Sequence, residues 1–295
     1  MTAMKGVRKS TRRRPAGIRI GRYELPPELT ISVMLSLLYV CFILGGSYER
    51  GDIVVQIAYF ALFGVIVFVF RSTQQYYTKL AYAFLVLAIL PMLWYVVDYL
   101  GFALATPDLS WFLLVGLVSL VVGTGLVAAL LYMDKGKLSD IYVQAGNVKE
   151  GLRAGLTTLG ASVALTAAYV IFRSGATDLA NLAFVLVGLV AFAACCAIAE
   201  ELLFRGMLLS RLLPLAGEKS AFVIQAFAFG AYAATFLYML NQDPLYSVAT
   251  FVVCGFAGLL LAWMTVKNKS LLPAVLAHAG LYLVIALPIF AQFIV

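Results

Sequence analysis

Long apolar runs follow one another along almost the whole chain. Nine of them have the length of about 17–25 residues that an α-helix needs to cross the hydrocarbon core of a bilayer. They lie at 29–46, 53–70, 80–100, 109–133, 155–172, 179–204, 219–240, 245–266 and 271–294. The composition agrees, because 63% of the residues are hydrophobic and only 12% are charged. A soluble domain cannot bury that much apolar surface, so the sequence predicts an all-α, polytopic transmembrane helix bundle with eight or nine spans.

Basic residues are distributed unevenly over the segments between these runs. With a cytoplasmic N-terminus, all of the 21 lysines and arginines except Arg50 and Arg173 lie in cytoplasmic segments or at their boundaries. This asymmetry is the one that the positive-inside rule describes. We therefore expect a cytoplasmic N-terminus and an integral multi-pass protein of the plasma membrane.

The order of charged and apolar segments predicts four regions. These are a basic cytoplasmic tail (1–24), an N-terminal accessory region of four spans (25–133), a cytoplasmic linker (134–153) and a second helical region (154–295). The tail could suggest nucleic-acid binding, since the net charge of the chain is +7. We interpret it as a topology determinant that contacts anionic lipid head groups, and expect no nucleic-acid partner.

Two glycines mark the start of the second half of the chain. Gly151 and Gly155 stand four residues apart, which places them on one face of a helix. Small residues at this spacing allow two helices to approach closely.

The stretch "AFAACCAIAEELLFRGMLLSRLL", residues 191–213, places two adjacent carboxylates in an apolar run. A charged side chain at the centre of a membrane helix costs about 2.5–3.5 kcal/mol, so such residues usually serve a function. Glu201 and Arg205 are four residues apart, with the glutamate first, and can neutralise each other within one helix. Glu200 has no such partner in its own helix. It is therefore the candidate reactive group, while Glu201 and Arg205 are candidates for holding it in place.

The only histidine of the chain is predicted to lie at a similar depth. Glu200 precedes the interfacial Arg211 by roughly 16 Å along a helix, and His278 follows the interfacial Lys269 by roughly 13 Å. An imidazole at this depth could donate to a developing oxyanion or accept a proton from water. Two structural roles stay open: a buried histidine that joins two helices, and a buried ion-pair network that holds the bundle together.

These motifs resemble those of the CPBP family, the CAAX-protease and bacteriocin-processing intramembrane proteins. Its first motif, EExxxR, is matched by Glu200, Glu201 and Arg205, and "LAHAG" supplies the histidine of its last motif, His278. The resemblance covers about residues 150–295 and implies that 154–295 is a catalytic helical core.

The chain departs from the family pattern at two positions. The middle motif, Phe-x-x-x-His, is represented by "FGAYA", which places Ala233 where the histidine belongs. The last motif expects Asn or a similar group four residues after its histidine, and position 282 is Tyr. The hydroxyl of Tyr282 could replace the Asn amide, since Tyr282 and His278 lie one turn apart on one helix face.

The resemblance implies an intramembrane endopeptidase that acts on a membrane-associated peptide or protein tail near the cytoplasmic leaflet. Glu200 would activate water and His278 would stabilise the oxyanion, with Glu201, Arg205 and Tyr282 in support. One alternative is an inactive relative that binds membrane peptides or gives immunity to a bacteriocin, which Ala233 favours. Another is a small transporter with Glu200 and His278 as a proton relay.

The sequence predicts no metal site and no cofactor. The four cysteines all fall in apolar runs without the spacing of metal ligands, and we interpret them as small buried side chains.

Overall fold

The computed structural model describes residues 18–20, 23–48, 53–74, 76–89, 109–174, 179–241 and 243–286. This part of the chain is helical except for a short antiparallel ribbon near the N-terminus. In the ribbon, β1 (Ile18–Ile20) pairs with β2 (Tyr23–Leu25) so that Ile18 lies opposite Leu25. The all-α class predicted from the apolar runs is therefore confirmed.

The helices follow the apolar runs closely. They are α1 (Pro27–Tyr48), α2 (Ile53–Thr73), a helix over Tyr76–Ile89, α4 (Leu109–Asp134), the 3₁₀ helix η1 (Leu138–Ile141), α5 (Val148–Ser174), α6 (Leu179–Glu201), the π-helix η2 (Leu202–Leu209), α7 (Ser210–Ala216), α8 (Glu218–Asn241), α9 (Pro244–Asn268) and α10 (Leu272–Ile285). α5 begins inside the linker predicted over 134–153. α6, η2 and α7 follow one another without a break.

Six helices among the described residues are long and apolar enough to cross a membrane. They include stretches of α1, α4, α5, α8 and α9, and one continuous stretch, Ala183–Ala216, that joins α6, η2 and α7. Three shorter apolar helices cover Ile57–Thr73, Tyr76–Ile89 and Leu272–Ile285. The protein is thus an integral multi-pass membrane protein. The count of eight or nine spans and the cytoplasmic N-terminus stay predictions, and residues 90–100 and 287–294 of two expected spans lie outside the described residues.

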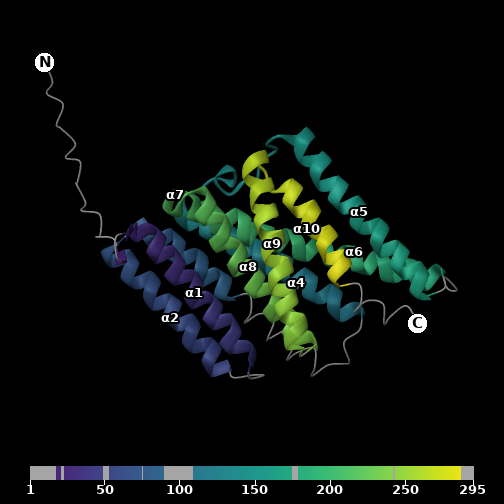
Figure 1. Cartoon of the computed structure of the whole chain (residues 1–295), viewed down its shortest axis with the longest axis horizontal. Coiled ribbons are helices and arrows are strands. Elements are labelled where there is room, and N and C mark those ends of the chain that lie inside the picture. Colours follow the sequence, from purple (N-terminus) through teal and green to yellow (C-terminus); the bar gives the residue numbers. More distant parts are fainter. Residues whose placement is uncertain are drawn as a thin grey trace, which may run out of the picture.

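The helices form one bundle around α8 and α9, which pack closely on each other. α1 packs against α8 on one side, and α10 packs against both α5 and α6 on the other. Figure 1 shows α1 and α2 at one end of the bundle and α5 at the opposite end, with α8, α9 and α10 between them. α4, from the predicted accessory region, packs against α6 and so touches the helix that carries the glutamates.

The outer surface of the bundle is apolar. Large hydrophobic side chains point outward from several of the long helices, among them Phe68 of α2, Phe172 of α5 and Phe256 of α9. Phe172 is 89% exposed. Such a surface would be unstable in water and suits contact with lipid chains.

The two glycines at the start of α5 allow α10 to approach closely, as the sequence predicted. A methyl group on Gly155 would lie 2.9 Å from Cβ of Leu276, and one on Gly151 would lie 3.2 Å from the ring of Pro273. Any larger side chain at Gly155 would push the two helices apart. The close packing matters for the site because α10 carries His278.

The linker between α4 and α5 is bonded to the turn that leads into α10. The carbonyl of Tyr142 accepts the N–H of Leu271 at 3.0 Å, and the carbonyl of Asn268 accepts the N–H of Asn147 at 2.9 Å. The side chains of Gln144 and Ser270 add two further bonds between the same segments. These bonds fix the point at which α10 starts.

We predict that Gly146→Ala destabilises the protein at this contact. Gly146 has φ +58°, and a methyl group there would lie 2.2 Å from the carbonyl oxygen of Asn268. Strain of this kind costs about 1–3 kcal/mol, so thermal unfolding in detergent should begin at a lower temperature. Gly160→Ala is the matched control, because nothing lies within 4 Å of the added methyl group. Equal melting of the two variants would show that the contact between the linker and the turn before α10 does not stabilise the protein.

Candidate active site

The two glutamates lie at the junction of α6 and η2, inside the bundle. Glu200 is 4% exposed and Glu201 is fully buried. The chain continues from them into a π-helix rather than an α-helix. π-helical turns are rare and occur frequently at functional sites.

Arg205 neutralises Glu201, as the spacing predicted. Its Nη1 lies 2.7 Å from Oε1 of Glu201, and both side chains are completely buried. The guanidinium also lies over the ring of Phe229 from α8, with its central carbon 4.2 Å from the ring centre. The face of an aromatic ring attracts a cation, so this contact adds to the stabilisation of the buried charge.

His278 reaches both glutamates from α10. Its Nδ1 lies 2.7 Å from Oε1 of Glu201, and its Nε2 lies 3.5 Å from Oε2 of Glu200. An ionised carboxylate can only accept a hydrogen bond, so Nδ1 carries a hydrogen and donates a hydrogen bond to Glu201. Nε2 is thereby directed at Glu200. The depth match inferred from the sequence corresponds to a direct contact.

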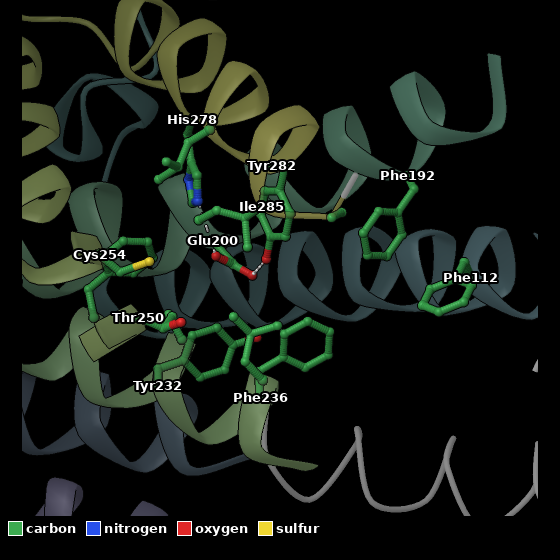
Figure 2. A pocket seen from close by; sticks show the side chains of 15 residues that line it. Phe112, Phe192, Glu200, Tyr232, Phe236, Thr250, Cys254, His278, Tyr282 and Ile285 are labelled. Atoms are coloured by element: carbon green, nitrogen blue, oxygen red, sulfur yellow. Dashed lines mark hydrogen bonds and ion pairs between the residues drawn. The ribbon is translucent and has the colours of Figure 1, made fainter. Parts of the chain in front are cut away.

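Tyr282 completes the group from the next turn of α10. Its hydroxyl donates a hydrogen bond to Oε1 of Glu200, and its ring stacks on the imidazole of His278 with 5.1 Å between the ring centres. Figure 2 shows the carboxylate of Glu200 between these two side chains. One oxygen of Glu200 faces the histidine and the other faces the tyrosine.

The buried charges of this group almost balance. Glu201 and Arg205 cancel each other, which leaves Glu200 with the neutral or protonated His278. An unbalanced buried charge is costly. One proton held on the Glu200–His278 pair makes the group neutral, either as a carboxylate facing an imidazolium or as a carboxylic acid facing an imidazole.

A narrow pocket with a volume of about 40 Å³ opens onto Glu200. Its polar side is formed by Glu200, His278 and Tyr282, and its remaining wall is mainly aromatic and aliphatic (Figure 2). The wall comes from five helices: Phe112 of α4, Phe192 of α6, Phe229, Tyr232, Ala233, Phe236 and Leu237 of α8, Thr250 and Cys254 of α9, and Leu281, Ile285 and Ala286 around α10. The carboxylate of Glu200 therefore faces a small space with a largely apolar wall.

The pocket contains the position that the family pattern assigns to a histidine. Ala233 is half-buried in its wall, beside Tyr232. A side chain longer than alanine at this position would therefore point toward the same space as Glu200 and His278. Among the described residues no group of three or more His, Cys, Asp or Glu side chains is arranged to hold a metal ion.

Every residue singled out from the sequence for the site is brought together, while most of the pocket wall was missed, including three residues outside the helices that carry the motifs. Phe112 was assigned to the accessory region, and Thr250 and Cys254 stand in an apolar run without any motif. No local pattern could have identified them, because they reach the pocket only through the packing of α4 and α9.

The fold and the site together define a class: a multi-pass membrane protein with a buried glutamate–histidine group beside an apolar pocket. Residues 181–284 match the model of the family described as Type II CAAX prenyl endopeptidase Rce1-like. The matched segment runs from α6 to α10 and contains all five candidate site residues and Ala233. The CPBP relationship recognised from the motifs is thus confirmed for this segment. No curated protein and no solved structure matches the chain.

We predict that Arg205→Met strongly destabilises the protein, because it leaves Glu201 charged and buried without its partner. Loss of one member of a buried ion pair typically costs about 3–5 kcal/mol. Adding Glu201→Gln should recover a large part of this loss, since the second change removes the unpaired charge. The measurement is thermal unfolding of the two single variants and the double variant in detergent. Strictly additive losses would show that the two side chains do not act as a pair.

Proposed function

We propose that the protein is a glutamate-dependent intramembrane endopeptidase. Its substrate is a membrane-associated peptide or protein tail, cleaved near the cytoplasmic leaflet of the plasma membrane. The observation that carries the proposal is the position of Glu200, which faces an apolar pocket with Nε2 of His278 3.5 Å from one carboxylate oxygen and the hydroxyl of Tyr282 on the other. The match to an endopeptidase family over residues 181–284 supports it.

In the proposed reaction, the carboxylate of Glu200 takes a proton from a water molecule in the pocket. The resulting hydroxide attacks the carbonyl carbon of the scissile peptide bond, and a tetrahedral oxyanion forms. The imidazolium of His278 donates from Nε2 to this oxyanion, which stabilises the charge. Glu200 then passes its proton to the departing amine, which breaks the C–N bond and leaves a new carboxyl end and a new amino end.

The supporting residues hold these two groups in place. Glu201 accepts a hydrogen bond from Nδ1 of His278 and so fixes the direction of Nε2. Arg205 forms an ion pair with Glu201, and Tyr282 fixes the rotation of the carboxylate of Glu200. The same arrangement, a carboxylate that orients a histidine, operates in the Ser-His-Asp triad. In this proposal residues 154–295 form the catalytic core, and α4 of the accessory region contributes Phe112 to the wall of its pocket.

A second function, peptide binding without cleavage, is favoured by Ala233. The proposed reaction has no imidazole at this position of the pocket wall, where the family pattern has one. The loss of one general acid–base group typically slows a reaction by about 10²–10⁴-fold. A binding protein would keep the apolar pocket but would not need the carboxylate of Glu200.

We predict that Glu200→Gln lowers the cleavage of membrane proteins by about 10²–10⁴-fold, because the amide cannot accept a proton from water. The measurement is mass spectrometry of new peptide termini in cells that express the wild type or the variant. Glu150→Gln is the matched control, since Glu150 is exposed at the start of α5, outside the pocket. Identical termini in the wild type and in a folded Glu200→Gln variant would reject the endopeptidase and favour binding.

We predict that Ala233→His raises the rate of cleavage, by up to about 10²-fold, because it returns a proton acceptor to the pocket. Ala233→Leu is the matched control, as it adds bulk at the same point without a basic group. The measurement is the initial rate on a peptide identified by its new termini. If histidine and leucine lower the rate equally, position 233 does not face the reacting bond.

A further inference from the structure

Helix α4 lies outside the segment that matches the family model, yet it packs along the helix that carries the glutamates. The matched segment begins at residue 181, whereas α4 covers Leu109–Asp134. It contacts both α6 and η2, the two elements that meet at the glutamates. The proposed reaction gives α4 no task beyond its contribution of Phe112 to the pocket wall.

Two glycines bring the backbone of α4 close to α6. A methyl group on Gly116 would lie 3.2 Å from the ring of Phe192, and one on Gly123 would lie 3.1 Å from Cβ of Ala199. Both distances are shorter than an ordinary van der Waals contact, so larger side chains at these positions would push the two helices apart. Ala199 directly precedes Glu200. The backbone of α4 thus lies against the turn of α6 that carries the reactive carboxylate.

Four rings connect α4 with the carboxylate of Glu200, and we call them the aromatic row: Phe112 of α4, Phe192 of α6, and Tyr282 and His278 of α10. The rings of Phe112 and Phe192 meet edge to face with their centres 5.8 Å apart, and those of Phe192 and Tyr282 meet in the same way, also at 5.8 Å. The ring of Tyr282 stacks on that of His278 at 5.1 Å. Figure 2 shows Phe192 between Phe112 and Tyr282, and the hydroxyl of Tyr282 on Glu200. Edge-to-face and offset-stacked contacts are the arrangements that aromatic rings prefer.

The row is tightly packed where it starts. Phe112 is 3% exposed and Phe192 is 2% exposed. Close packing leaves such rings little freedom to move independently, so the position of Phe112 affects that of Phe192 and then that of Tyr282. A hydrogen bond weakens steeply as its angle departs from linear. The position of the tyrosine ring therefore decides how well its hydroxyl holds the carboxylate of Glu200.

We propose that Phe112 is a positioning residue of the active site, which acts on Glu200 through Phe192 and Tyr282. α4 thereby supports the reacting carboxylate from outside the matched segment. This role rests on the proposed endopeptidase function. It differs from a role in which Phe112 only contacts the substrate, because the loss of such a contact raises KM, whereas a misplaced reacting group lowers kcat.

Steady-state kinetics of Phe112→Leu test the proposal on a peptide identified by its new termini. We expect kcat to fall about tenfold with KM changed less than about twofold, because misplacement of a reacting group by about 1 Å can cost about 10²-fold. Tyr282→Phe should lower kcat by itself. Adding Phe112→Leu to Tyr282→Phe should cause no further fall, because the hydroxyl through which Phe112 acts is already absent. An unchanged kcat in Phe112→Leu, equal fractional losses in the two backgrounds, or a rise in KM alone would overturn the proposal.

Two further variants keep this result decisive. Phe172→Leu makes the same change at the exposed Phe172 of α5, and should leave kcat and KM unchanged. Phe192→Leu, in the middle of the aromatic row, should have the same effects as Phe112→Leu, and it replaces that variant if Phe112→Leu does not fold.

A readout that needs no catalysis separates this proposal from the proposed function. 3-Fluorotyrosine, incorporated in place of Tyr282 in the full-length protein, reports the surroundings of the ring by its ¹⁹F resonance in detergent. We expect this resonance to shift in Phe112→Leu and to stay in place in Phe172→Leu. No cleavage by the wild type would reject the endopeptidase alone, and the resonance would then decide whether Phe112 positions Tyr282. An unchanged resonance in Phe112→Leu would overturn the inference, whether or not peptides are cleaved.

Discussion

The rest of the site depends on the hydrogen bonds that the carboxylate of Glu201 accepts. A single oxygen of it accepts hydrogen bonds from Arg205 of its own helix and from His278 of α10, both at 2.7 Å. It therefore neutralises a fully buried guanidinium and joins α6 to the helix that carries the histidine. Without it, the guanidinium would be buried without a counter-charge and the imidazole would have no fixed direction. Two further contacts keep α10 in the position that this hydrogen bond requires. They are the packing of α10 against α5 and the hydrogen bonds between the linker and the turn before α10.

The departures from the family pattern are local and fall on the same pocket. Ala233 leaves one wall without an imidazole, and Tyr282 places a hydroxyl on Glu200. Because the group is shielded from water, each hydrogen bond and each charge in it has a larger effect than it would at the surface. The continuous helical stretch Ala183–Ala216 carries this group near its middle and Arg211 near its end.

Much of the fold and of the candidate site could be predicted from the sequence, because the relevant rules act along a single helix. Apolar runs of membrane-spanning length predict helices, since a helix forms all its backbone hydrogen bonds within its own segment and needs no water in the lipid. The pairing of Glu201 with Arg205 follows from the four-residue spacing, and the depth of His278 follows from the constant rise of an α-helix. The spacing of Gly151 and Gly155 predicted a close helix contact for the same reason, but not that the partner is α10. The sequence by itself therefore determined the fold class, the segment that carries the site and the polar residues in it.

Only the tertiary structure decided which side chains touch. The bond of Tyr282 to Glu200 and the position of Nδ1 of His278 against Glu201 depend on how α10 is rotated about its axis relative to α6. Phe112, Thr250 and Cys254 reach the pocket through the packing of α4 and α9. Helical periodicity places residues on a face of their own helix, but it contains no information about which neighbour that face meets. That choice is made by the shape of the packed bundle.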